Sequence, residues 1–377
     1  MKAKSLFMAL GAAVALSSCA GTSEQAAPLV IANGEQIIDT EGNPVNCHGG
    51  GFLTVGDTTY WYGEQRPSRM SSPQLGVSCY STTDFKNWTN RGIVLPVSED
   101  AAEGLTPGCI VERPKVIYND KTGKYVLWFH HELPGRGYEA AHCGVAVSDT
   151  PTGPFTLLHS TRANAGQYPI NFPDSLHGKH AGVDFDNLEW WTPEWQQMVD
   201  EGLFVDRDLE GGQMSRDMTL YVDEDGKAYH IYSSEENLTL QIAELTDDYT
   251  AHTGKYIRIF PGGHNEAPTI FKRDGEYWMI TSGCTGWAPN KARMMHASDI
   301  MGEWTMMEDT PFTGEGADTT FGGQGTYIVE IGGQPVFVAD IWKPENLKDS
   351  RTLWLPIEFG EDGVPTIPYV ANYEIKR

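Results

Sequence analysis

The chain has 377 residues, of which 40% are hydrophobic and 21% are charged, so it can bury a large core and is not a disordered chain. Its 51 acidic and 27 basic residues give a formal net charge of −24, which argues against nucleic acid and anionic membrane surfaces as partners. We expect most of this acidity to keep the protein soluble.

Residues 1–18 are typical of a bacterial export signal. Two lysines lie within the first four residues, and residues 6–16 form an apolar run that is too short to cross a bilayer. The run Leu-Ser-Ser-Cys-Ala then resembles a lipobox, in which the cysteine, here Cys19, becomes the acylated first residue of the mature chain; an ordinary cleavage site is the alternative. The sequence predicts a lipid-anchored protein of the cell envelope, periplasmic or on the outer-membrane surface, with residues 19–44 as tether and first segment.

One plan repeats along residues 45–377. A charged or amide residue stands before an apolar run, which leads through a turn rich in Asp and Gly to a second apolar run. The clear copies span residues 112–128, 216–232 and 266–280, and weaker copies start at His48 and Gln324. Repeats at this scale predict the blades of a β-propeller.

A second pattern follows several of these hairpins. It consists of another apolar strand, a turn that contains Asp, and a buried aromatic residue, as in residues 76–88, 144–155 and 292–304. Each repeat therefore holds about four strands. We expect an all-β fold with a single domain, a five-bladed β-propeller.

The repeats are unevenly spaced. Glu266 follows Asp217 by 49 residues, a normal blade length, whereas Asp217 follows Glu112 by 105 residues. The excess lies at about 160–213 and predicts a long inserted loop between blades 2 and 3, with a short helix over 193–201. This insert could wall a substrate cleft or could be a packed surface segment. The candidate sugar platforms within it are Trp190, Trp191 and Trp195.

Five cysteines follow Cys19, and an odd number leaves at least one free thiol. They form no CxxC pair and no Cys/His group at zinc spacing. Cys79 and Cys143 lie in apolar strand patterns and should be buried. The first residues of the repeats should converge at one end of the propeller, which we call the mouth. The other three cysteines, which could form a disulfide near it, are Cys47, Cys109 and Cys284.

Three acids, Glu112, Asp217 and Glu266, occupy the same place in successive repeats. Propeller geometry would bring them together at one mouth. Cleavage of a glycosidic bond needs an acid for the leaving oxygen and a second group that activates water or attacks carbon. Repulsion among carboxylates raises the pKa of one of them, which then can act as the acid. The alternative is that each acid only forms a salt bridge or a turn, but three acids in register favour a glycosidase.

Several motifs resemble glycoside hydrolase family 43, most of all its branch of exo-β-1,3-galactanases and related enzymes. The matching segments are residues 112–119, 215–220, 266–268 and 281–287, with further matches at 48–51, 61–64 and 350–356. The resemblance covers roughly residues 45–370 and implies a five-bladed β-propeller.

The resemblance also implies catalytic roles. Glu266 would be the general acid, and Asp217 would bind sugar hydroxyls and help to set the pKa of that acid. Most of the family has a catalytic Asp in the first blade, where this chain has Cys-His-Gly at 47–49. The galactanase-like branch shares this departure and is proposed to handle water with a Gln and a Glu, which correspond here to Gln324 and Glu112. The serines that flank this Gln in the branch are glycines here, which leaves its fine positioning open.

A neutral amide has little affinity for a proton, so Glu112 is the more orthodox base. Gln324 would then position the water, or act as an imidic-acid tautomer. Either route implies inversion at the sugar carbon. The resemblance also implies a pocket for the terminal sugar, in which Trp287 stacks on a sugar face or belongs to the core, and His48 faces the pocket or the axis or is a structural hydrogen-bonder. The other pocket residues would be Glu64, Tyr138, Asn237 and Thr285.

We therefore expect an exo-acting, inverting glycoside hydrolase that trims plant polysaccharide, releasing galactose from β-1,3-galactan or arabinogalactan. The alternatives are an α-L-arabinofuranosidase of the same family and a non-catalytic glycan-binding propeller. The expected partner is an oligo- or polysaccharide, and no protein partner is predicted. No cofactor is required and no metal motif is present, although some family members hold a calcium ion on the propeller axis.

Overall fold

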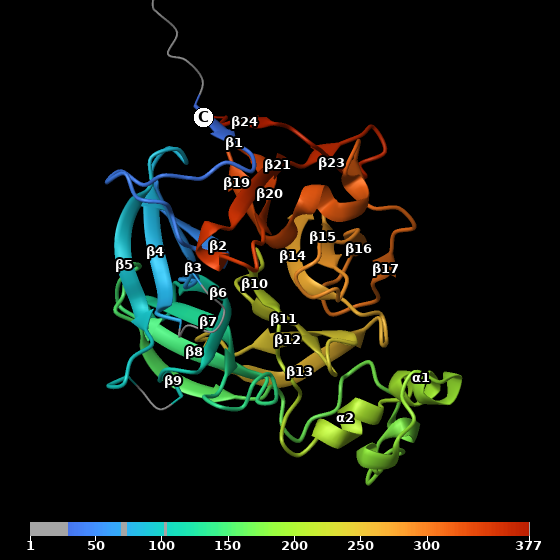
Figure 1. The fold of residues 1–377 in the computed structure, drawn as a ribbon. Coiled ribbons are helices and arrows are strands. Elements are labelled where there is room, and N and C mark those ends of the chain that lie inside the picture. The colour runs from blue at the N-terminus through green and yellow to red at the C-terminus, as the bar shows by residue number, and fades with distance from the viewer. Residues whose placement is uncertain (1–28, 69–73, 102–103, 377) are drawn as a thin grey trace, which may run out of the picture.

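The computed structural model describes residues 29–68, 74–101 and 104–376, which form an all-β propeller with its sheets arranged around a central axis (Figure 1). Cys19 lies outside these residues, so its lipidation stays a prediction. Among the described helices, none combines the length and the apolar character that a membrane crossing requires.

Four sheets follow one plan, each with four antiparallel strands in sequential order. The first contains β2 (His48–Val55), β3 (Thr58–Glu64), β4 (Gly76–Thr82) and β5 (Thr89–Pro96). The second contains β6 (Ile110–Asn119), β7 (Lys124–Glu132), β8 (His142–Ser148) and β9 (Thr156–Thr161). The third contains β10 (Met218–Val222), β11 (Ala228–Ser234), β12 (Thr239–Leu245) and β13 (His252–Ile259). The fourth contains β14 (Glu266–Arg273), β15 (Glu276–Ser282), β16 (Arg293–Ala297) and β17 (Thr305–Met306).

The last part of the chain corrects the prediction of five blades. A fifth sheet has only three strands, β19 (Gln324–Ile331), β20 (Gln334–Ile341) and β21 (Arg351–Pro356). A sixth sheet is mixed and contains β18 (Phe312–Thr313), β23 (Pro365–Pro368) and β22 (Glu358–Phe359). The described chain therefore has six sheets of three or four strands, not five. The reason is that the chain after β21 pairs with β18, which precedes β19, and does not add a fourth strand to the fifth sheet.

We call the first strand of each of the first five sheets its inner strand, and the charged or amide residue at the start of each repeat its opener. The inner strands bring these openers together. β2, β6, β10, β14 and β19 contact one another in that order, and β19 contacts β2. One cavity lies at the N-terminal ends of these strands and another at their C-terminal ends. Residues at the starts of the inner strands therefore meet at one mouth, as the sequence predicted.

The predicted hairpins are confirmed. In the second sheet Val116 lies opposite Leu127, and in the fourth Ile270 lies opposite Met279. Side chains alternate between the two faces of each strand, so both faces of these strands contribute to the core between neighbouring sheets. The aromatic residue that ends the fourth repeat, Trp304, is buried as expected.

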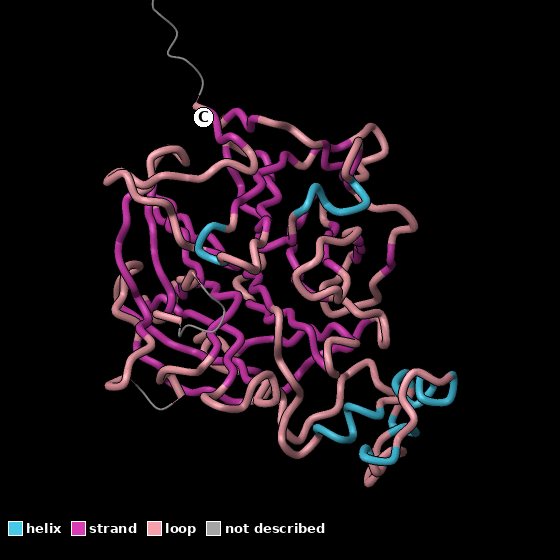
Figure 2. Tube along the Cα trace, in the orientation of Figure 1, coloured by secondary structure: helices cyan, strands magenta, loops and turns pink. Residues whose placement is uncertain are grey.

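Residues 162–217, between β9 and β10, form a helical segment whose ends are bonded to the second and third sheets and whose helices lie beside the sheets (Figure 2). The predicted helix is confirmed as α1 (Pro193–Asp200), and α2 (Leu203–Asp208) follows it. Proline at the first helical position and the Thr192 side chain, which accepts a hydrogen bond from the Trp195 backbone N–H, favour a helix start here. Trp195, Phe204 and neighbouring apolar side chains pack together, so this segment is a small folded unit. The described 3₁₀-helices are η1 (Asp174–Leu176), η2 (Phe185–Asn187), η3 (Ala317–Gly322) and η4 (Leu347–Asp349).

A buried ion pair fastens the helical segment to the third sheet. The Arg258 guanidinium donates to the Glu235 carboxylate at 2.7 and 2.8 Å. The same guanidinium donates to the backbone carbonyls of Val199 and Asp200 at the end of α1. These carbonyls have no partner within the helix, so Arg258 also caps it.

The two ends of the described chain close the molecule. β1 (Val30–Ala32) pairs antiparallel with β24 (Asn372–Glu374). The Asn33 side chain donates to the carbonyls of Trp354 and Val370 and accepts from the Trp354 N–H. The first and last strands are thereby joined to each other and to the fifth sheet.

Candidate active site

A β-bulge recurs after the first site residue of several inner strands and directs the acidic side chains into the mouth. β2, β6 and β14 each shift register immediately after their first site residue, at His48, Glu112 and Glu266. The residue that follows each opener has a positive φ, +53° at Arg113 and +49° at Ala267. A β-bulge of this kind bends the strand and redirects a side chain. The carboxylates therefore leave the regular pleat and project toward the axis.

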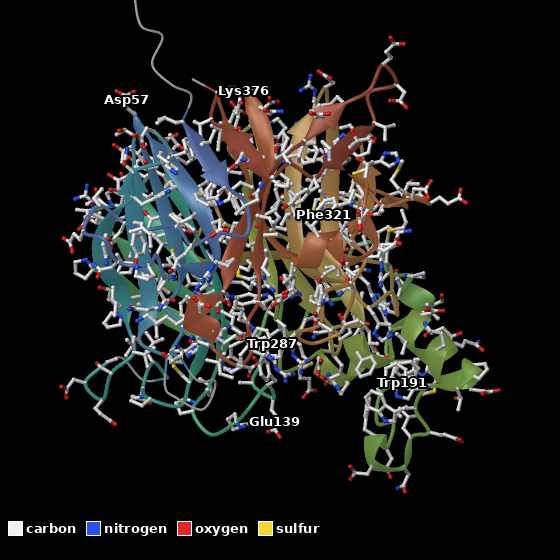
Figure 3. The ribbon with its side chains drawn as sticks, turned by 45° about the horizontal axis from the view of Figure 1, so that its top comes forward. Asp57, Glu139, Trp191, Trp287, Phe321 and Lys376 are labelled. Carbon is white, nitrogen blue, oxygen red and sulfur yellow. The ribbon has the colours of Figure 1, made fainter. Side chains whose placement is uncertain are left out.

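These side chains line a cavity of about 340 Å³ at the mouth. Eight of the ten residues predicted for the site are among its walls: Glu64, Glu112, Tyr138, Asp217, Asn237, Glu266, Trp287 and Gln324. Figure 3 shows Trp287 and Glu139 on the side of the molecule that lies opposite to Asp57 and Lys376.

Glu266 has the environment expected of a group that carries a proton near neutral pH. Burial, together with the charge of Asp217, raises the pKa of Glu266 to about 7. Asn237 Nδ2 donates to Glu266 Oε1 at 2.8 Å, which leaves Oε2 to hold a proton. Asp217 is itself held by Arg113 Nη2 at 2.8 Å and by the Ala267 N–H at 3.1 Å.

Glu112 lies in the opposite environment. Its Oε1 accepts from Arg66 Nη2 at 2.8 Å and from the Tyr138 hydroxyl at 2.9 Å, and His130 Nδ1 lies 3.2 Å from Oε2. Burial alone would raise the pKa of Glu112, but the His130 hydrogen bond and the Arg66 charge hold that pKa well below its usual range. Glu112 is therefore ionised wherever the protein is folded and active.

Glu64 shares Arg66 with Glu112. It is 1% exposed, forms an ion pair with Arg66 and accepts the Arg113 N–H at 2.8 Å. Burial raises the pKa of Glu64 to about 7. One guanidinium thus serves two carboxyl groups, of which Glu64 is the one that takes up a proton more readily.

Gln324 is held at both ends of its amide. Its Oε1 accepts from Arg113 Nη2 at 2.6 Å and from Trp342 Nε1 at 2.9 Å, and its Nε2 donates to Ser282 Oγ at 3.0 Å. The loss of both flanking serines in the sequence therefore does not leave this side chain without contacts. One N–H of the amide remains for a ligand in the mouth.

Comparison with known proteins identifies the family. The model of the glycosyl hydrolases family 43 matches residues 194–365. The solved structure of the GH43 β-1,3-galactosidase BT3683 with galactodeoxynojirimycin is 55% identical, with a TM-score of 0.88, and the alignment covers 92% of this chain and 100% of that one. The chain belongs to glycoside hydrolase family 43. It is therefore a glycosidase.

Two further solved structures are similar to this chain. The exo-β-1,3-galactanase 1,3Gal43A from Clostridium thermocellum is 36% identical, with a TM-score of 0.74 and coverage of 92% of this chain and 67% of that one. The exo-β-1,3-galactanase Pc1,3Gal43A from Phanerochaete chrysosporium, solved as a single-residue variant with β-1,3-galactotriose, is 29% identical, with a TM-score of 0.72 and coverage of 92% and 69%. Among curated proteins no match was found.

Two predicted site residues lie outside the mouth of the hydrolase. His48 is 2% exposed, and its Nδ1 lies 3.1 Å from Asp340 Oδ1, so it is a structural hydrogen-bonder and not a sugar ligand. Thr285 bonds to Ala288 and Asn290 within its own loop and borders a neighbouring cavity. The side chain of His48 lies against the fifth sheet, where Asp340 is part of β20.

Several residues that line the pocket were not predicted from the sequence. Arg66, His130, Arg216 and Trp342 all line it. Arg66 lies two residues after Glu64, at the same end of β3, which was the available signal. Trp342 follows β20 in the weakest repeat, and no motif indicated it. The Arg66 guanidinium lies about 6 Å from the rings of both Trp287 and Trp342, so cation and aromatic rings build one wall together.

The cysteine predictions are partly resolved. Cys79 and Cys143 are buried, as expected. All five cysteines of the described residues are free thiols, so the disulfide that we considered near the mouth does not form. Cys284 lies within hydrogen-bond reach of Glu266 and donates to the Asn237 carbonyl at 3.5 Å.

The residues between the inner strands do not fit a structural calcium ion. Glu112, His130 and Asp217 have ligand atoms within 4.8 Å of one another, but Arg66 and Arg113 already neutralise these carboxylates. The buried Lys115 Nζ donates to the carbonyls of Gly49 and Arg113 at 2.9 and 3.3 Å. Calcium requires six to eight oxygen ligands, and cationic side chains hold the oxygens that this hydrolase offers.

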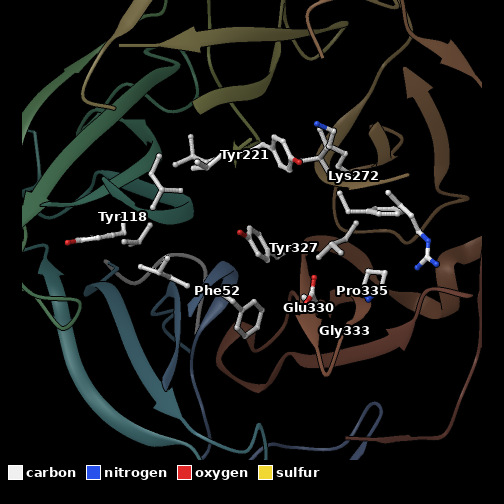
Figure 4. Close-up of a pocket in the computed structure, with 17 residues that line it drawn as sticks. Phe52, Tyr118, Tyr221, Lys272, Tyr327, Glu330, Gly333 and Pro335 are labelled. Carbon is white, nitrogen blue, oxygen red and sulfur yellow. The ribbon is translucent and has the colours of Figure 1, made fainter. Parts of the chain in front are cut away.

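A second cavity, of about 490 Å³, lies at the other end of the inner strands (Figure 4). Its walls include Phe52, Tyr118, Tyr221 and Tyr327. None of the residues predicted for the active site is among them. The chemistry of the hydrolase therefore belongs to the mouth at the N-terminal ends of the strands.

Proposed function

We propose that this hydrolase is an exo-acting, inverting enzyme that releases galactose from the ends of β-1,3-galactan chains, such as those of plant arabinogalactan. The observation that carries the reaction is the contrast between two carboxyl groups of one pocket: the pKa of Glu266 is raised and that of Glu112 is lowered. Such pairs mark an acid and its ionised counterpart. The sugar is supported by the full-length likeness to a β-1,3-galactosidase.

Exo action is supported by the likeness to two exo-β-1,3-galactanases, which are 36% and 29% identical to this chain.

The acid step follows from the contacts of Glu266. Its proton, on Oε2, passes to the glycosidic oxygen as the bond to the sugar carbon breaks. The charge of Asp217, which is paired with Arg113, keeps the proton on Glu266 until the substrate arrives. Asp217 can also accept a hydrogen bond from a sugar hydroxyl.

The water step is assigned to Glu112 and Gln324 together. An imidic-acid tautomer of Gln324 would carry a proton on Oε1, where Arg113 and Trp342 already donate. The amide form fits these contacts, so Gln324 orients the water through its remaining N–H. A carboxylate has about four lone-pair sites, of which Arg66, Tyr138 and His130 occupy three in Glu112. The fourth remains for the proton of the water.

The sugar assignment is tested by product release. Wild type and Glu266→Gln are incubated with β-1,3-galactobiose, debranched arabinogalactan and an aryl α-L-arabinofuranoside, and free sugars are quantified. We expect galactose from the first two, as the α-anomer when followed by NMR, and a loss of at least about 10³-fold in Glu266→Gln. Arabinose alone would assign the enzyme to the arabinofuranosidases. Binding of the oligosaccharide by the folded wild type without any product would indicate a glycan-binding propeller.

The water step has its own test in Glu112→Gln and Gln324→Glu. If Glu112 takes the proton, Glu112→Gln loses turnover by about 10²-fold or more, because a neutral amide cannot accept it. Gln324→Glu should keep measurable turnover, because a carboxylate can accept the same bonds from Arg113 and Trp342. Full activity of Glu112→Gln, together with complete inactivity of Gln324→Glu, would contradict this assignment and favour the tautomer.

A further inference from the structure

Trp191, in the helical segment just before α1, is held in an exposed and unfavourable conformation. Its side chain is 67% exposed. Its φ is +69°, in the left-handed region that large side chains rarely adopt. Strain of this kind persists where the surroundings impose it, and it concentrates at functional positions.

Packing fixes the place of this ring but does not bury it. Trp191 precedes the N-cap Thr192 of α1, and its ring lies 4.8 Å from that of Trp195. It stacks on His264 at 5.6 Å, with 22° between the ring planes. The core of the segment consists of other residues, with Trp195 and Phe204 at 2% and 0% exposure. Stability of the segment therefore does not explain why an indole is presented to solvent here.

The partner of this stack borders a cavity beside the active site. The cavity has a volume of about 590 Å³ and is lined by His264, residues 283–285 and residues 290–293, among others. The loop 283–287 separates it from the catalytic pocket, because Gly286 and Trp287 line that pocket. Asn290 holds the loop in shape through bonds to both backbone groups of Gly283.

We propose that Trp191, His264 and this cavity form a subsite for the part of the galactan chain that lies beyond the bond being cleaved. The proposal rests on the proposed function and adds a place where the polymer, as distinct from its terminal sugar, is recognised.

The position of the acid determines the side on which this part of the chain leaves. Glu266 protonates the oxygen that joins the terminal sugar to the rest of the chain, so the rest of the chain must pass on the Glu266 side of the pocket. His264 lies two residues before Glu266, and Cys284, which lies within hydrogen-bond reach of Glu266, borders the neighbouring cavity. Trp191 and Trp287 lie on the same side of the molecule (Figure 3). A chain that leaves in this direction meets His264 and then the indole.

The chemistry suits a neutral polysaccharide. A flat indole ring can pack against the apolar face of a pyranose, and its N–H can bond to a hydroxyl. Lys291 also borders the same cavity and brings a polar side chain to it. Such a subsite would contribute binding energy to chains that extend to the indole, so we expect the polymer to depend on it more than a disaccharide does.

The experiment compares substrate lengths. Wild type, Trp191→Ala and Trp191→Phe are assayed on β-1,3-galactobiose and on debranched β-1,3-galactan, with released galactose as the common product. For Trp191→Ala we expect a KM on the polymer that rises by about tenfold, the loss expected from one aromatic contact. Its kcat on the polymer and both constants on the disaccharide should stay within about twofold of wild type. Trp191→Phe should recover most of the affinity.

Tyr118→Ala is the matched control, because it removes an exposed aromatic ring at the opposite end of the inner strands. An unchanged KM of Trp191→Ala on the polymer, or an equal loss on the disaccharide, would overturn the subsite. If wild type releases no galactose at all, the proposed function fails instead. The subsite is then decided by electrophoresis of wild type and Trp191→Ala in gels that contain the galactan, where retardation that depends on Trp191 would support it and equal mobility would overturn it.

Discussion

At the scale of single residues, glutamates of one pocket differ in their pKa because their neighbours differ. Glu112, Glu64 and Glu266 are all glutamates, but the first accepts bonds from Arg66, His130 and Tyr138, and the pKa values of the other two rise to about 7. Glu112, Asp217 and Glu266 could be predicted from the sequence because each opens a repeat, whereas Glu64, at the end of β3, was expected only from the family resemblance. Their cationic partners could not, because Arg66 comes from the end of a second strand, outside the repeated position.

The raised pKa of Glu266 predicts how activity depends on pH. The acid must be protonated, so kcat/KM on β-1,3-galactobiose should fall as the pH rises through about 7. Asp217 is one cause of the raised pKa, and its removal favours the ionised form of Glu266. Asp217→Asn should therefore move the alkaline limb of the profile to lower pH, whatever happens to the maximal rate. A limb that stays in place, or moves upward, would contradict the coupling between the two carboxyl groups.

At the scale of structural elements, the bulge after each opener is the device that builds the site. The alternation of residues in β6 and β14 predicted the strands and their partners, but the positive φ at Arg113 and Ala267 has no signature in those residue types. The same limit applies to residues 162–217. Thr192 and Pro193 indicated a helix, whereas the ion pair that fastens it joins residues of β13 and the turn before β12.

This ion pair should dominate the stability of the helical segment. Arg258→Met leaves the Glu235 carboxylate buried without its cationic partner and removes the side-chain donor from two carbonyls of α1. We expect a loss of about 3–5 kcal/mol in the free energy of unfolding, measured by urea titration. Lys121→Met, which removes the exposed pair with Asp247, is the control and should cost less than about 1 kcal/mol. A similar small loss for both variants would show that Arg258 does not fasten the segment.

At the scale of the whole molecule, the propeller could be predicted but its sheet count could not. The repeats from Glu112, Asp217 and Glu266 each carry four strands, and the structure agrees. The sixth sheet arises because β23 pairs with β18 across more than fifty residues of chain, and strand pairs so short leave almost no pattern in a sequence. The same applies to β1 and β24, which join three residues at each end.

The joining of β1 to β24 also determines how the enzyme can be attached to something else. Both ends of the described chain leave from the side that carries Lys376, and Trp287 marks the mouth on the other side (Figure 3). A carrier domain or a resin attached at either end of the described chain would therefore face away from the incoming polysaccharide. Immobilisation through the termini should leave the catalytic opening accessible, whereas coupling through surface groups near Glu139 would block it.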